Sequence, residues 1–116
     1  MNVDEAIRDL LNISTDIRSV AVLGPECETI AWGPGAVSSG LAAAADRLWD
    51  AASACATATD AALDHIVVHD VDGAVAVLQA DGRRIAAMTG THPAVGLLLF
   101  DLRTCLSDAF GEEGPA

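Results

Sequence analysis

The most regular hydrophobic pattern in the chain lies between Asp64 and Thr89, where three short runs of β-branched and small apolar residues are separated by two Asp-Gly pairs. Asp72-Gly73 and Asp81-Gly82 are strong signals for tight turns, because both residue types tolerate the positive φ angles that a hairpin requires. The pattern therefore predicts a meander of three antiparallel strands: Ile66–Asp70, Gly73–Gln79 and Arg83–Thr89.

The first strand of this meander is apolar at three consecutive positions, Ile66, Val67 and Val68. A strand with one face in water alternates between apolar and polar residues, so a continuous apolar run indicates that both faces are covered. The pattern does not say what covers the second face.

The N-terminal part of the chain predicts a helix followed by a hairpin. Residues 2–14 carry one apolar stripe at helical spacing, with Asn2 as the cap and Glu5 completing a capping box. Residues 17–23 and 28–32 alternate as strands do, and Gly24-Pro25 between them favours a turn.

Two further helices are expected. The first lies between Val37 and Thr59 and is mostly alanine, which favours helix but leaves little side-chain volume, so its neighbours must approach closely. The second is capped by Thr91, with Pro93 in its first turn, and carries an apolar stripe to Phe110. Two large apolar residues fall away from that stripe and could contact a partner: Leu97 and Phe100.

The predicted order of elements is α-β-β-α-β-β-β-α. It favours an α+β fold with a five-stranded antiparallel sheet, the terminal helices on one face and the long central helix on the other. The length suits a single domain over residues 1–110, followed by a disordered polar tail over 111–116.

Charge and composition narrow the class of partner. The formal net charge is -11 and the chain contains no lysine, which argues against nucleic acid or an anionic membrane as partner. Three cysteines without short spacing fit neither a disulfide framework nor a zinc site. With no secretory leader and no apolar run of membrane-spanning length, we expect a cytoplasmic protein.

The two histidines of the first meander strand, His65 and His69, share one face and could bind a metal or sense pH. They lie about 13 Å apart in an extended chain, too far to share one ion, so we favour polar residues at the ends of an interface strand. Asp70-Val71-Asp72-Gly73 is similar to the start of a calcium loop but lacks the distal glutamate, so we favour a turn.

No sequence pattern in the chain indicates an enzyme active site. Cys27 lies between two glutamates, whose charges disfavour the reactive thiolate. Gly33-Pro34-Gly35 is not followed by the Gly-Lys-Ser/Thr of a phosphate loop. Arg83 and Arg84 suit a solvated strand better than an arginine finger. We therefore expect no catalytic residues, no cofactor and no bound metal.

Four segments carry a resemblance to a known family: Ile17–Leu23 after an amphipathic helix, Thr29-Ile30-Ala31, His65–Val68 followed by Asp72-Gly73, and Pro93–Leu98 with its Gly-Leu pair. In these segments and in the order of its elements, the chain from Val3 to Phe110 resembles the Roadblock family. That family is named for a dynein light chain and includes bacterial regulators of Ras-like GTPases.

The resemblance implies a homodimer in which the third strands pair across a two-fold axis and the second helices pack together. Such pairing would explain the apolar strand, and close helix packing would explain the alanines. Trp49 would anchor the interface. The expected interface residues are Ile66, Val67, Val68, Leu48, Trp49 and Ala52.

The resemblance also implies a function. The expected protein is a non-enzymatic homodimer that binds and regulates a Ras-like small GTPase, by ordering its switch loops rather than by donating a catalytic residue. The alternative is a small-molecule-sensing or structural scaffold domain of longin-like or profilin-like architecture, with an apolar pocket near Trp32. A heterodimer with a related chain stays open.

Overall fold

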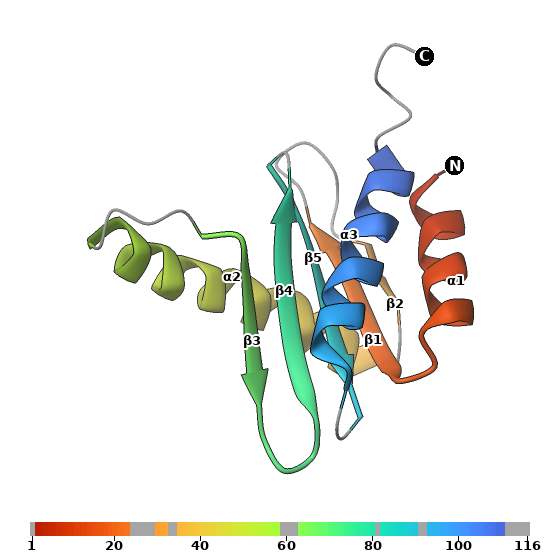
Figure 1. The fold of residues 1–116 in the computed structure, drawn as a ribbon, viewed down its shortest axis with the longest axis horizontal. Helices are drawn as coiled ribbons and strands as arrows, with labels where there is room; N and C mark the ends of the chain where they lie inside the picture. The colour runs from red at the N-terminus through yellow and green to blue at the C-terminus, as the bar shows by residue number, and fades with distance from the viewer. Residues whose placement is uncertain are drawn as a thin grey trace.

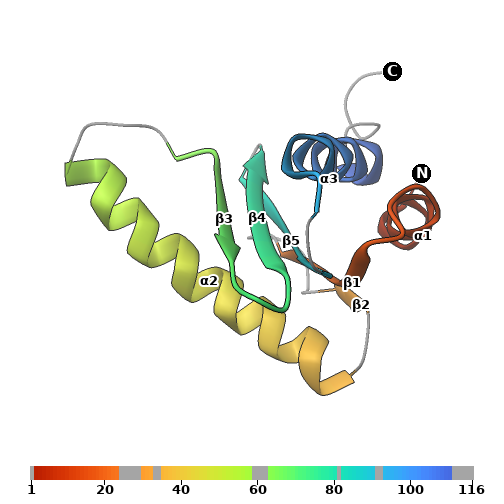
Figure 2. The same ribbon diagram turned by 60° about the horizontal axis from the view of Figure 1, so that its bottom comes forward.

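The computed structural model describes residues 2–23, 30–32, 35–58, 63–80, 82–90 and 93–110. Its elements in chain order are α1 (Val3–Ile13), β1 (Ile17–Leu23), β2 (Ile30–Trp32), α2 (Gly35–Ala58), β3 (His65–His69), β4 (Ala74–Ala80), β5 (Arg83–Thr89) and α3 (Val95–Phe110). The strands form one antiparallel sheet in the order β2-β1-β5-β4-β3. α1 and α3 lie on one face of the sheet and α2 crosses the other (Figures 1 and 2).

The α+β class, with three helices around an antiparallel sheet, is confirmed. The sheet has four longer strands and the three-residue β2 at one edge, and the order of elements agrees with the prediction when β2 is counted. β1 and β5 have the predicted bounds, and β3 and β4 differ by one residue. The predicted turn at Gly24-Pro25 and the tail over 111–116 lie outside the described residues.

The two terminal helices begin differently from each other. In α1, the Asn2 side chain accepts a hydrogen bond from the N–H of Glu5 at 2.9 Å, which confirms the predicted cap. In α3, the carbonyl of Ala94 accepts from the N–H of Leu98 at 2.8 Å, so Pro93 precedes the helix instead of lying in its first turn. A proline suits either place, because neither requires its missing N–H. Thr91, the predicted cap, lies outside the described residues.

Two hydrophobic cores lie on the two faces of the sheet. The larger lies under α1 and α3 and includes the fully buried Leu10, Leu78, Ile85 and Leu102. The smaller lies under α2 and combines three alanines, Ala21, Ala45 and Ala86, with larger apolar residues, of which Trp49 is the largest.

The turn between β3 and β4 is closed by Asp70. Its carboxylate accepts hydrogen bonds from the N–H groups of Asp72 at 2.7 Å and Gly73 at 3.0 Å, and its own N–H donates to the carbonyl of Gly73 at 2.9 Å. The turn is therefore centred on Val71-Asp72, one residue before the Asp-Gly pair. Gly73 is required for another reason: a Cβ there would collide with the carbonyl oxygen of Thr89 in β5.

The packing of α3 predicts that Leu98→Ala destabilises the protein by roughly 2–5 kcal/mol, because Leu98 is buried in the larger core. The neighbouring Leu97 is 61% exposed, so Leu97→Ala should change stability by less than about 0.5 kcal/mol. Urea denaturation of both variants measures the difference. Equal midpoints would show that the side of α3 that faces the core is assigned wrongly.

Candidate protein-interaction surface

Among the strands whose side chains the structure describes, the most exposed apolar residue, Val68, lies on the edge strand β3. In the part of the chain that the structure describes, β3 pairs only with β4. Ile66 and Val67 are half-buried, whereas Val68 is 45% exposed. Val67 packs against the core under α1 and α3, and Ile66 packs against the core under α2. The apolar run of β3 therefore has one face partly covered by each core, while the outer edge of the strand is open.

The backbone of β3 is arranged to accept another strand. The N–H of Gln79 donates to the carbonyl of Asp64 at 3.1 Å, and the N–H of Asp70 donates to Gly73, so the even-numbered positions face β4. Backbone groups alternate in direction along an antiparallel strand. Three residues therefore direct their N–H and C=O groups away from the sheet: His65, Val67 and His69. Such an edge is a template for strand pairing.

α2 extends beyond this edge. The helix crosses the sheet on the diagonal, and its C-terminal part projects past β3 (Figures 1 and 2). Ala51, Ala54 and Cys55 on this part are exposed, and Ala52 is half-buried, as is Leu48 one turn earlier. The projecting helix thus presents mostly small side chains, which allow a second helix to approach closely.

Trp49 lies inside one chain and not at the surface. It is 4% exposed and packs in the core under α2, together with Leu41 and Ala45. These residues are four apart, so they follow one side of the helix. Trp49 therefore has almost no surface to offer a second copy, and the expectation that it anchors an interface is corrected.

The side chain of Arg84 holds this part of α2 on the sheet. Its guanidinium carbon lies 5.1 Å from the centroid of the Trp49 ring, and its Nη1 lies 3.1 Å from Oδ1 of Asp46. Its Nε donates a hydrogen bond to Gln79 at 2.9 Å. Arg84 thus joins β5, β4 and α2, a role that the sequence does not reveal because Asp46 is 38 residues away.

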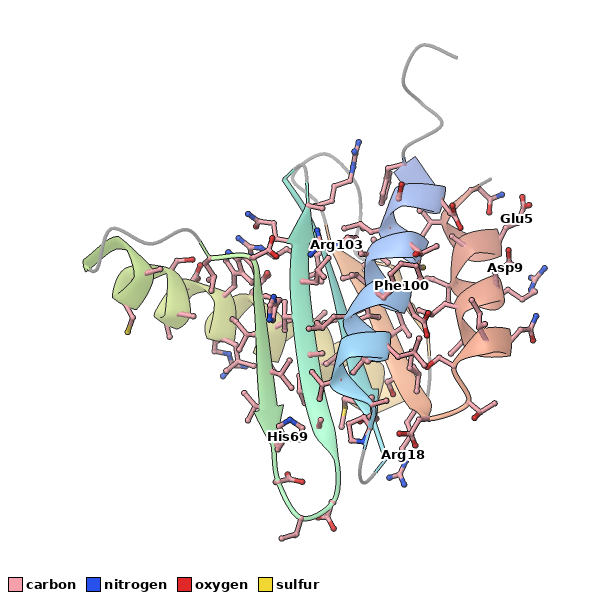
Figure 3. All side chains as sticks on the ribbon, in the orientation of Figure 1. Glu5, Asp9, Arg18, His69, Phe100 and Arg103 are labelled. Atoms are coloured by element: carbon pink, nitrogen blue, oxygen red, sulfur yellow. The ribbon has the colours of Figure 1, made fainter. Side chains whose placement is uncertain are left out.

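The two candidate partner contacts on α3 lie apart from the β3 edge. Leu97 is 61% and Phe100 65% exposed. Figure 3 shows Phe100 on the outer side of α3, on the face of the sheet opposite α2. The structure therefore does not bring the predicted dimer residues of α2 and these two residues into one surface.

A hollow of about 500 Å³ lies between α3 and the adjoining ends of β3, β4 and β5. Nη2 of Arg103 lies 3.1 Å from Oδ2 of Asp64, and the guanidinium of Arg83 lies 4.1 Å from the centroid of the Phe110 ring. The remaining lining residues are Gln79, Ala80, Leu106 and Ser107. The lining is mainly polar, unlike the apolar pocket expected near Trp32, whose side chain lies outside the described residues.

Within the described part of one chain, no three His, Cys, Asp or Glu side chains are grouped so that they could hold a metal ion. Of the helices that the structure describes, none has the length and apolar character needed to cross a bilayer. Cys105 is buried, and burial raises the pKa of its thiol to about 12, with the charges of Asp108 and Asp9 adding to the effect.

The fold places the protein in the class of three-layer α+β domains. Its exposed features include an open strand edge, β3, and a projecting helix, α2. Among solved structures, the chain is similar to the Roadblock/LC7 domain from Streptomyces avermitilis, with a TM-score of 0.82 over 99% of this chain and 100% of that chain. The sequences are 13% identical, so the similarity is one of fold, and the chain has the Roadblock/LC7 fold.

This similarity confirms the resemblance to the Roadblock family that the sequence motifs indicate, as far as the fold is concerned. No protein-family model matches the sequence. No curated protein matches it either.

The raised pKa of Cys105 predicts that its thiol resists alkylation. In a Cys27→Ser/Cys55→Ser variant, iodoacetamide at pH 9 should modify Cys105 at least about 100-fold more slowly in the folded protein than in urea, because a thiol with a pKa near 12 is almost fully protonated at that pH. A Cys27→Ser/Cys105→Ser variant is the control, since Cys55 is exposed and should react while folded. Fast modification of folded Cys105 would contradict its burial.

Proposed function

We propose that this chain forms a homodimer through β3 and α2, and that the dimer binds and regulates a Ras-like small GTPase without a catalytic group of its own. The observation that carries the proposal is the open β3 edge, where a continuous apolar run coincides with three outward-facing backbone positions. The Roadblock/LC7 fold supports the same arrangement.

Pairing of β3 with a second copy would join the two sheets into one. The outward N–H and C=O groups of β3 would find partners, and the exposed side chain of Val68 would be covered. The projecting part of α2 would then meet its counterpart, with Leu48 and Ala52 in contact. Trp49 would serve this interface indirectly, by fixing α2 on its own sheet.

The GTPase proposal rests on the resemblance to the Roadblock family. Arg84 and Arg103 are paired within the chain with Asp46 and Asp64. These two arginines are therefore engaged in structural contacts, and by resemblance to the family we propose that regulation works by ordering of the GTPase's own switch loops. We place the protein in the cytoplasm, where such a partner is found.

Leu97 and Phe100 are the proposed contacts for the GTPase. Both are exposed, and both lie on the face of the sheet opposite α2, so dimerisation through β3 and α2 leaves them accessible. The wild-type chain added to a purified Ras-like GTPase from the same organism should co-elute with that GTPase and change its rate of GTP hydrolysis. A Leu97→Ala/Phe100→Ala variant should dimerise normally but bind at least about tenfold more weakly. Absence of binding by the wild-type dimer would overturn the GTPase proposal.

The dimer predicts that Val68→Asp yields a folded monomer. Val68 is exposed enough to accept a charge in one chain, whereas in a paired strand the carboxylate would be buried without a partner. Val67 is less suitable, because it also packs in the core under α1 and α3. Sedimentation over a wide concentration range, with circular dichroism for folding, measures the outcome.

Leu97→Asp is the matched control for this variant. It introduces the same charge at an exposed apolar residue, but on α3. It should sediment as the wild-type dimer does. A Val68→Asp chain that still forms a dimer would show that the interface lies elsewhere.

The hollow beside α3 favours a second candidate, a small-molecule sensor. Its volume falls within the range of ligand sites, although its charged lining is unusual for one. In a thermal-shift screen, a true ligand should raise the melting temperature of the wild-type chain and not that of Arg103→Ala. If no compound does so, the sensor function is unsupported.

A further inference from the structure

The two histidines of β3 lie on the same side of the sheet. His65 pairs with Leu78 and His69 with Ala74, and side chains of paired residues share a face. Leu78 belongs to the core under α1 and α3, so both imidazoles lie on that face. Both are exposed, and Figure 3 shows the His69 ring beside the end of β3, clear of α3.

Within one chain these imidazoles cannot share an ion, because residues four apart in a strand are separated by about 13 Å. A second copy changes this geometry. β3 has five residues with Val67 at its midpoint. The antiparallel pairing that uses the whole strand therefore places Val67 opposite itself and His65 opposite the partner's His69.

The direction of the backbone groups supports this register. His65, Val67 and His69 are the positions whose N–H and C=O groups face outward, so each would form a hydrogen-bonded pair with its opposite residue. The Cα atoms of such a pair lie about 5.5 Å apart, and the side chains lie on one face. Two histidine pairs would thus form, one at each end of the joined strands.

We propose that the homodimer binds two divalent transition-metal ions of the zinc type, each held by His65 of one copy and the partner's His69. The inference rests on the proposed dimer and is otherwise independent of the GTPase. Imidazole nitrogens bind Zn²⁺ at about 2.0–2.1 Å, so both rings of a cross-strand pair can reach one ion. The strongly acidic chain, at -11 without lysine, favours cations near its surface.

Asp64 is the nearest carboxylate that the structure places beside His65. Its Oδ2 lies 3.7 Å from Nδ1 of His65, and the same oxygen is 3.1 Å from Nη2 of Arg103. At 3.7 Å the carboxylate is too far from the ring for a hydrogen bond and places a negative charge beside the pair. Arg103 holds Asp64 in this place, and water completes the coordination of the ion.

The test compares zinc binding with dimerisation in the full-length chain. Titration with ZnCl₂ after treatment with chelator should show two ions per dimer. With zinc at about ten times the Kd of each site, linkage should lower the dimer dissociation constant by about 100-fold. His65→Ala and His69→Ala should each lose zinc binding and keep the zinc-free dimer. His92→Ala, which removes the remaining histidine, should bind as the wild type does.

A mixture of the two variants makes the test specific for cross-strand pairs. After exchange of subunits, each heterodimer of His65→Ala with His69→Ala retains one intact pair, so one zinc site per heterodimer should reappear although neither variant binds zinc alone. A general structural effect of either substitution would not produce this rescue.

The outcomes separate the metal site from the proposed function. A wild-type dimer that binds no zinc, or variants that bind as well as the wild type, would overturn the metal site and leave the dimer standing. A mixture without rescue would overturn the pairing of His65 with the partner's His69. A chain that stays monomeric with and without zinc would overturn the dimer itself.

Discussion

The open edge of β3 is the constraint on which the other features of this molecule depend. Proteins protect exposed strand edges with charges, prolines, bulges or covering loops, and β3 has none of these between its two terminal histidines. Water can satisfy its outward N–H and C=O groups, but it cannot cover the apolar run at Ile66–Val68. An edge of this kind is stable in solution when another strand covers it.

Several contacts fix the position of this edge relative to the rest of the fold. Asp70 closes the turn after β3 with three hydrogen bonds, and the lack of a side chain at Gly73 lets that turn lie against Thr89 of β5. On the other face, Arg84 fixes the middle of α2 through Asp46 and Trp49. Because α2 is held there, its C-terminal part projects beyond β3 in a fixed direction (Figure 2).

The sequence predicted the elements that depend on local chemistry. The alternation in β1, the turn residues of the meander and the Asn2 cap are all set within a few residues of the chain. The sequence did not indicate that Trp49 faces the sheet, because a helix made largely of alanine has almost no apolar stripe from which its buried side could be predicted. The contacts of Arg84 with Asp46 and of Arg103 with Asp64 join residues 38 and 39 apart, so no local pattern could indicate them.

Which residues of two paired β3 strands lie opposite each other is a separate question from how tightly the two copies bind. Sliding one copy along the other by two residues keeps every side chain on its own face, so the apolar residues alone do not define a unique pairing. The residues at the two ends of β3 therefore have to select the register. His65 and His69 are the end residues of β3, and only the full-length pairing places each opposite its counterpart in the second copy. A metal ion at each pair would stabilise that register over the shifted ones, so that the same two ions would also fix how the two α2 helices meet.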